Sequence, residues 1–195
     1  MANWFKPKVN TGEIIPEIEK LLQRFDYLGL TEQNDPINQI ASDIMRDDFN
    51  KIMLGSPYLN IYHFAINGKQ FYCCDRAVKT SVEVRRHMSL LTTGVSKIPG
   101  FEISTNTNDE FINNDCEPVG TVGVCNIRVE NMNEYDNYKS VLVLFLPHLE
   151  RFSTSSAPIS FFAFPEDSIL GYHVSGRLIN LEELVSAVAL LQNFL

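Results

Sequence analysis

One cysteine and one histidine are spaced so that they can act as a nucleophile and its base: Cys74 and His63. They fall on segments 58–65 and 69–76, which flank Asn67-Gly68, and an Asn-Gly pair between such segments is a strong β-hairpin signal. In the register that this turn sets, the two side chains lie diagonally on one face, about 7–8 Å apart between backbones. An imidazole there favours the nucleophilic thiolate, as a cysteine-dependent enzyme requires. Packing of two sheet residues beneath a helix is the simpler interpretation.

Other patterns that carry chemistry are absent from the sequence. It has no G-x-G-x-x-G, G-x-x-x-x-G-K-[ST], G-x-S-x-G or H-E-x-x-H motif. The histidines are too far apart for the short ligand spacings of zinc sites. They are His63, His87, His148 and His173. We therefore expect no metal and no cofactor, and we lean towards a protein that is not an enzyme.

The basic residues concentrate in one short stretch that contains Arg76, Arg85 and Arg86. Guanidinium groups bind phosphate and carboxylate through paired N–H donors, so this stretch is a candidate anion-binding site. The alternative is a solvated face of a helix expected over residues 78–92. The second interpretation is the simpler one.

Composition restricts the partners and the compartment. The chain has 195 residues, 16 Lys+Arg and 24 Asp+Glu, hence a net charge of −8, which argues against nucleic acid as a partner. The longest apolar run, 141–146, is too short to cross a membrane, and the N-terminus does not resemble a signal peptide. We expect all four cysteines to be reduced thiols. We therefore expect a cytoplasmic protein, or one within an intracellularly assembled particle. The asparagine-rich composition favours a bacterial or phage source.

Apolar periodicity predicts the elements that must position these residues. Helices are expected from Pro16 to Gly29, from Pro36 to before Gly55, over 78–92, and after the Asn180-x-x-Glu183 capping box. Besides the hairpin, strands are expected over segments 121–130, 141–146, 159–164 and 171–179. The class is α+β, with a mainly antiparallel sheet of five to seven strands, two N-terminal helices, one middle helix and a C-terminal helix. Residues 1–11 form an arm, and residues 12–195 form one domain with a long polar loop at 104–120.

Several large apolar residues lie outside the expected packing elements. Trp4 and Phe5 are on the arm, and Phe111 and Ile112 are inside the polar loop. Small domains seldom leave such residues uncovered, so we expect them to contact a protein partner or another copy of the chain. The leading hypothesis is a non-enzymatic interaction module: a small subunit of a larger assembly, virion-type or other, or a partner-neutralising protein. The alternatives are the Cys74–His63 enzyme and a small-molecule-sensing domain.

Overall fold

The computed structural model describes residues 8–9, 15–44, 58–79, 84–95, 98–105, 115–154 and 157–195. Within these residues the strands are β1 (Lys8–Val9), β2 (Asp26–Leu30), β3 (Tyr58–Ile66), β4 (Lys69–Lys79), β5 (Val84–Thr93), β6 (Phe101–Ser104), β7 (Glu117–Val122), β8 (Cys125–Val129), β9 (Ile159–Phe164) and β10 (Ile169–Ser175). All ten belong to one sheet, in the order β1-β3-β4-β5-β10-β9-β6-β8-β7, with β2 paired to β3 beside that path. Every pairing is antiparallel except that of β1 with β3. The α+β class and the mainly antiparallel sheet are confirmed, but the expected five to seven strands were too few.

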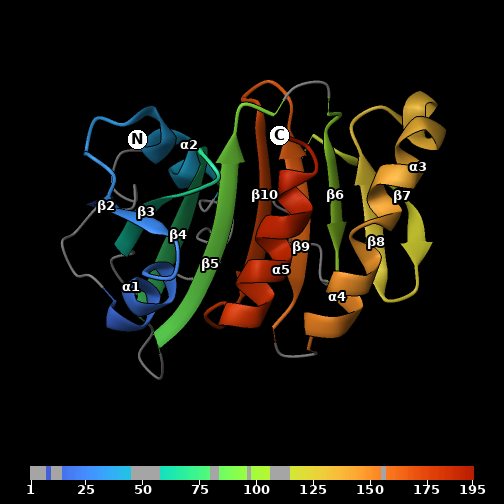
Figure 1. Ribbon diagram of the computed structural model, residues 1–195. Helices are drawn as coiled ribbons and strands as arrows, with labels where there is room; N and C mark the ends of the chain where they lie inside the picture. The colour runs from blue at the N-terminus through green and yellow to red at the C-terminus, as the bar shows by residue number, and fades with distance from the viewer. Residues whose placement is uncertain are drawn as a thin grey trace, which may run out of the picture.

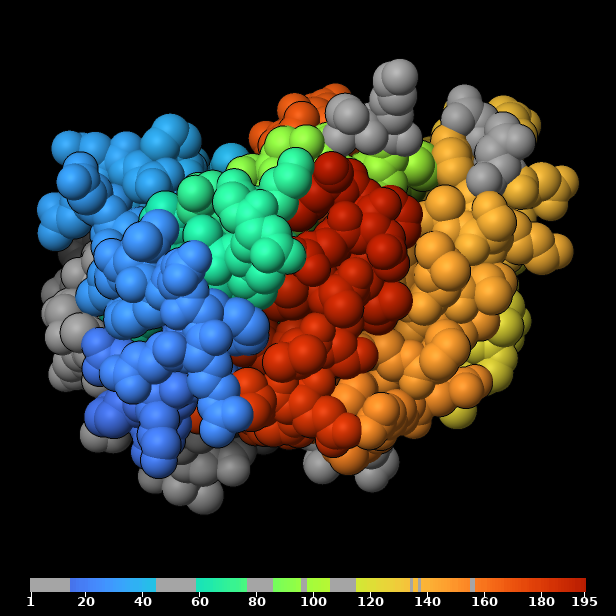
Figure 2. Space-filling view, viewed as in Figure 1, coloured from blue at the N-terminus to red at the C-terminus, as the bar shows by residue number. Residues whose placement is uncertain are grey.

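Helices cover both faces of this sheet. They are α1 (Pro16–Leu22), α2 (Pro36–Ile44), α3 (Tyr135–Val143), α4 (Leu146–Phe152) and α5 (Leu181–Gln192), with a short 3₁₀ helix η2 at Met132–Glu134. α1, α5 and the α3–α4 segment lie side by side over one face (Figure 1), and they form much of its outer surface (Figure 2, blue, red and orange). α2 packs with residues of the opposite side-chain parity, such as Ile61 and Cys74, so it covers the other face.

The β3–β4 hairpin has the predicted register. Ile66 is opposite Lys69, and the pairing continues inward from there through Phe64 with Phe71. Asn67 and Gly68 both adopt positive φ angles, 53° and 75°, as a two-residue turn between right-twisted strands requires. The local turn chemistry therefore fixes which side chains share a face.

The expected middle helix over 78–92 was wrong, because the described residues of this segment, 78–79 and 84–92, are in strands. β4 continues to Lys79, and β5 then runs back beside it and also pairs with β10. Met88 and Leu90 face one helix layer, while Leu91 faces the other with α2. Because both faces of β5 are covered, its apolar residues do not alternate strictly, and they imitate helical spacing.

Segment 141–146, expected as a strand, is the junction of α3 and α4. Leu142 and Phe145 are buried three residues apart, whereas Val143 and Leu144 between them are exposed. That spacing is helical, and the backbone N–H of Phe145 donates to Leu142 O. A continuous run of six apolar residues fits a buried strand or a helix equally well, and the pattern alone does not decide.

Further boundaries differ from expectation, and β10 covers Ile169–Ser175 where a strand was expected over 171–179. α1 begins at Pro16 as predicted but ends at Leu22, and β2 follows where the helix was expected to reach Gly29. The expected strand 121–130 is a hairpin instead, because β7 and β8 pair across Gly123-Val124. β7 therefore occupies part of the expected polar loop 104–120.

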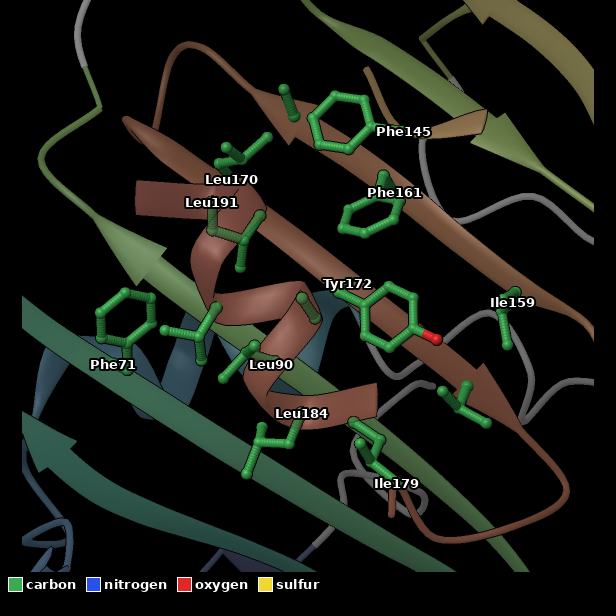
Figure 3. Packing of buried hydrophobic residues seen from close by; sticks show 14 of the residues in the cluster. Phe71, Leu90, Phe145, Ile159, Phe161, Leu170, Tyr172, Ile179, Leu184 and Leu191 are labelled. Carbon is green, nitrogen blue, oxygen red and sulfur yellow. The ribbon is translucent and has the colours of Figure 1, made fainter. Parts of the chain in front are cut away.

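The larger core lies between the sheet and the layer of α1, α5 and α4. The ring of Phe145 stacks on Phe161 at 4.4 Å between centroids, and α5 places Leu184 and Leu191 over β10 (Figure 3). Tyr172 of β10 lies beside Phe161 (Figure 3), with 4.7 Å between the ring centroids, and its hydroxyl donates to Glu183 Oε1. This core fixes α5 and α4 on the sheet.

On the other face, Gly171 of β10 is packed against large side chains, so we predict that Gly171→Ala destabilises the protein. A Cβ atom there would lie 2.6 Å from the Cε2 atom of Phe162 and 2.9 Å from the Cδ2 atom of Leu91. Overpacking of this kind costs about 1–3 kcal/mol of unfolding free energy. Urea unfolding checks this, and Phe162→Leu in the Gly171→Ala background is expected to recover part of the loss. No loss in the single variant would contradict the packing.

Candidate functional site

Cys74 and His63 lie diagonally on one sheet face, as the sequence predicts, because Cys74 is opposite Ile61 and His63 is opposite Tyr72. The imidazole, however, stacks on the ring of Tyr72 at 4.9 Å, and its Nε2 hydrogen-bonds to Gln70 Oε1. Cys74 is fully buried in the cluster beneath α2. Burial, and secondarily the charge of Asp75, raise the pKa of the thiol well above its ordinary value. The contacts therefore favour a packed thiol over an activated one.

We predict that Cys74 is alkylated slowly in the folded protein. Its raised pKa leaves little thiolate at pH 8, and its side chain is inaccessible. Iodoacetamide labelling followed by peptide mass spectrometry measures the rate at each cysteine. Labelling is expected to become complete after unfolding in urea. Rapid labelling of Cys74 in the native protein would revive the cysteine-enzyme alternative.

The predicted basic face is divided between the two sides of the sheet, because its residues lie on strands. Arg86 Nη1 forms an ion pair with the buried Asp75 at 3.2 Å. Arg76 is buried and lies opposite His87, on the face that α2 covers. Arg85 belongs to β5, and its side chain is outside the described part. A single anion site that uses Arg76 together with Arg86 therefore has no support in this geometry.

The other predicted site residues cannot be placed. Trp4, Phe5, Phe111 and Ile112 lie outside the described residues, and the interaction predicted for them stays a prediction. Within the described ranges, no group of three or more His, Cys, Asp or Glu side chains is arranged to hold a metal ion. In the same ranges, no helix is long and apolar enough to cross a bilayer.

A polar row that the sequence analysis missed crosses the α2 side of β5 and β10. The Oγ atom of Ser89 lies 2.8 Å from Nδ1 of His173, whose Nε2 lies 3.1 Å from the Oγ of Ser175. The rings of His87 and His173 stack at 6.0 Å. Ser89 and His173 are 84 positions apart in the sequence, and they lie on β5 and β10, whose pairing was not predicted. No rule of sequence spacing therefore reveals the row. Ser89 is fully buried, which makes the row an internal hydrogen-bonded network.

The surface feature that stands out is apolar. Of the seven large hydrophobic side chains exposed in the described residues, five belong to the β7–β8 hairpin, η2 and the α3–α4 junction. These five are Val122, Val124, Met132, Val143 and Leu144, here called the apolar end. The elements that carry them form one end of the molecule (Figure 1). The other two, Leu28 and Val185, lie on β2 and α5.

No family model matches the chain, and no curated protein matches it in sequence. Among solved structures it is similar to the crystal structure of the mycobacterial trehalose monomycolate transport factor A, TtfA. The two share 12% sequence identity over 90% of this chain and 89% of that chain, with a TM-score of 0.53. This likeness shows the fold alone. It extends over nearly the whole of both chains, so the large sheet with its helices is an arrangement that TtfA shares.

Proposed function

We propose that this chain is a non-catalytic protein-interaction module, a small subunit of a larger assembly or a partner-neutralising protein, and that its partner docks on the apolar end. The observation that carries the proposal is the gathering of five exposed large hydrophobic side chains on adjoining elements. A concentration of exposed large apolar side chains at one end of a domain is typical of a surface that a partner covers. Covering them would remove apolar area from water at about 25 cal/mol per Å².

The chemistry of the interior supports a binding role over catalysis. The thiol of Cys74 is buried with a raised pKa, and His63 is engaged by Tyr72 and Gln70. Ser89 and His173 of the polar row are likewise buried and hydrogen-bonded to each other. TtfA is named as a transport factor, but a likeness at 12% identity gives no reason to assign its cargo to this chain.

Site-specific photo-crosslinking in the native source tests the proposal. A photoreactive amino acid replaces Val143, which is 52% exposed, and in a matched control it replaces Leu28, which is 58% exposed on the opposite end of the sheet. We expect Val143 to give one discrete heavier product and Leu28 to give none. Equal crosslinking at both positions, or none at Val143, would contradict the proposal.

A further inference from the structure

We infer, on the basis of the proposed function, that the apolar end binds a basic amphipathic helix of a partner protein. The charges around the apolar end carry this inference. Among the side chains of residues 115–154 that the structure describes as exposed, acidic groups outnumber basic ones by five to two. The acidic residues are Asp115, Glu117, Glu130, Asp136 and Glu150, and the basic ones are Lys139 and Arg151. Arg151 also forms an ion pair with Glu182, so little positive charge is left to a partner.

The carboxylate of Glu150 lies close to the turn that carries Val122 and Val124. A Cβ atom placed on Gly123, between Val122 and Val124, would be 3.1 Å from the Oε1 atom of Glu150, so this carboxylate lies at the tip of the β7–β8 hairpin. Burial raises the pKa of the neighbouring Cys125 thiol to about 11, and the charge of Glu150 adds to that shift. A cationic side chain of a partner at this turn would lie near both the carboxylate of Glu150 and the apolar side chains of Val122 and Val124.

The end of the β7–β8 hairpin opposite its turn is also followed by both exposed apolar and acidic residues. Glu130 ends β8 two residues before the exposed Met132, and Asp136 lies in the first turn of α3. Negative charge therefore flanks the apolar side chains at both ends of the hairpin. Complementary charge steers association and selects partners, so the occupant is expected to carry Lys or Arg beside its apolar residues.

The same charges disfavour other occupants. A second copy of this chain would bring an acidic surface onto an acidic surface, within a molecule of net charge −8. Nucleic acid and anionic lipid are repelled for the same reason. A protein with a basic, apolar segment remains the occupant that the surface favours.

A helix fits this surface better than an added strand. β7 is the edge of the sheet, but Pro118 lies within it, and the pairing register shifts between Pro118 and Gly120. Proline has no N–H to offer, and such irregularities protect edges from pairing with another chain. Recognition must then use side chains, as when an amphipathic helix lies on an apolar surface.

The test uses the full chain and two fluorescent helical 18-residue peptides, one of leucine and lysine and one of leucine and glutamate. Fluorescence anisotropy measures their binding to the wild type, to Val143→Asp/Leu144→Asp, and to two charge-reversed variants of equal net charge. Glu117→Lys/Glu150→Lys changes the apolar end, and Asp26→Lys/Glu32→Lys changes exposed acids of β2 and its following loop at the other end of the sheet. Circular dichroism confirms that each variant is folded.

We expect the lysine peptide to bind the wild type and the glutamate peptide not to bind. Affinity for the lysine peptide should fall at least about tenfold in Glu117→Lys/Glu150→Lys and in Val143→Asp/Leu144→Asp, change little in the β2 variant, and decrease with added salt. Equal losses in the two charge-reversed variants would show attraction by overall charge and overturn the inference. Self-association at the apolar end in sedimentation experiments, or binding to anionic vesicles, would also overturn it.

The inference and the proposed function fail in different ways. A discrete photo-crosslink at Val143 that persists in Glu117→Lys/Glu150→Lys and in high salt would overturn the basic partner and leave the interaction module standing. Absence of that crosslink removes the proposed function, whatever the peptides do.

Discussion

Arg177→Ala is expected to lower the free energy of unfolding by about 3–5 kcal/mol, because it leaves a buried carboxylate without its counter-charge. Glu183 of α5 is completely buried, and both of its oxygens accept hydrogen bonds from the guanidinium of Arg177, at 2.6 and 2.8 Å. The hydroxyl of Tyr172 donates to the same carboxylate at 2.5 Å. After the substitution, only hydrogen bonds from neutral groups stabilise the charge.

Arg177 also connects three parts of the chain, which adds to the expected loss. Its Nη2 donates to the carbonyl oxygen of Phe152 at the end of α4, and its Nη1 donates to that of Leu178. Glu183 in turn accepts from the backbone N–H of Asn180, which completes the N-terminal cap of α5. One ion pair therefore ties α4, α5 and β10 together in the layer above the sheet.

A second arginine–glutamate pair, whose glutamate also lies on α5, provides a matched control. Arg151 pairs with Glu182, the neighbour of Glu183, but these side chains are 61% and 66% exposed, against 28% and 0% for Arg177 and Glu183. Exposed ion pairs contribute about 0–1 kcal/mol, so Arg151→Ala should change stability little. Urea unfolding followed by circular dichroism compares the two variants. Similar losses for both would show that burial does not set the strength of the Glu183 pair.

This ion pair also shows how far the sequence reaches. The capping box at Asn180 and Glu183 follows from local spacing, and both of its hydrogen bonds are present. The hydrogen bond from Tyr172 depends on how α5 lies over β10, which no local pattern encodes. Sequence reasoning therefore located the helix start but not the buried network that uses the same glutamate.

The parts of the sheet that could be predicted are those with a clear local signal in the sequence. The β3–β4 register followed from Asn67-Gly68, and the apolar run 159–164 was correctly predicted to be a strand, β9. The prediction for β5 was wrong because this strand pairs on both edges and is covered on both faces. Its apolar residues therefore do not show the alternation, with a period of two, that identifies a strand. The apolar end was missed because Val143 lies in an apolar run whose exposed members are distinguished only after the helix phase is known.

A second large effect is expected on acidification, where His148 and Asp75 act in opposite directions. His148 is buried between α4 and the sheet, with its Nδ1 2.8 Å from the Oγ of Ser186 and its ring against Tyr172. Burial lowers its pKa from 6.5 to about 4; Glu183 opposes that shift, and Arg151 and Arg177 add to it. Between these values the unfolded chain binds the additional proton, so the contribution of His148 to stability falls as the pH falls from 6.5 to 4.

The titration of Asp75 changes stability with pH in the opposite direction. Burial raises its pKa from 3.8 to about 6, although Arg86 and His87 partly offset the shift. The folded chain then binds the additional proton between pH 3.8 and 6. Its contribution to stability is therefore fully present below pH 3.8 and is lost as the pH rises through 6.

The two effects are about 3 kcal/mol each and largely cancel in the wild type between pH 4 and 6. His148→Phe should remove one of them, so that its stability relative to the wild type increases as the pH is lowered from 6.5 to 4. Asp75→Asn should show the reverse, with a relative stability that decreases over pH 6 to 4. Urea unfolding at pH 4, 5, 6 and 7 measures both differences. If each variant kept the pH dependence of the wild type, neither group would be titrating from a buried position. Opposite slopes would show that the titrations of His148 and Asp75 offset each other across the acidic range.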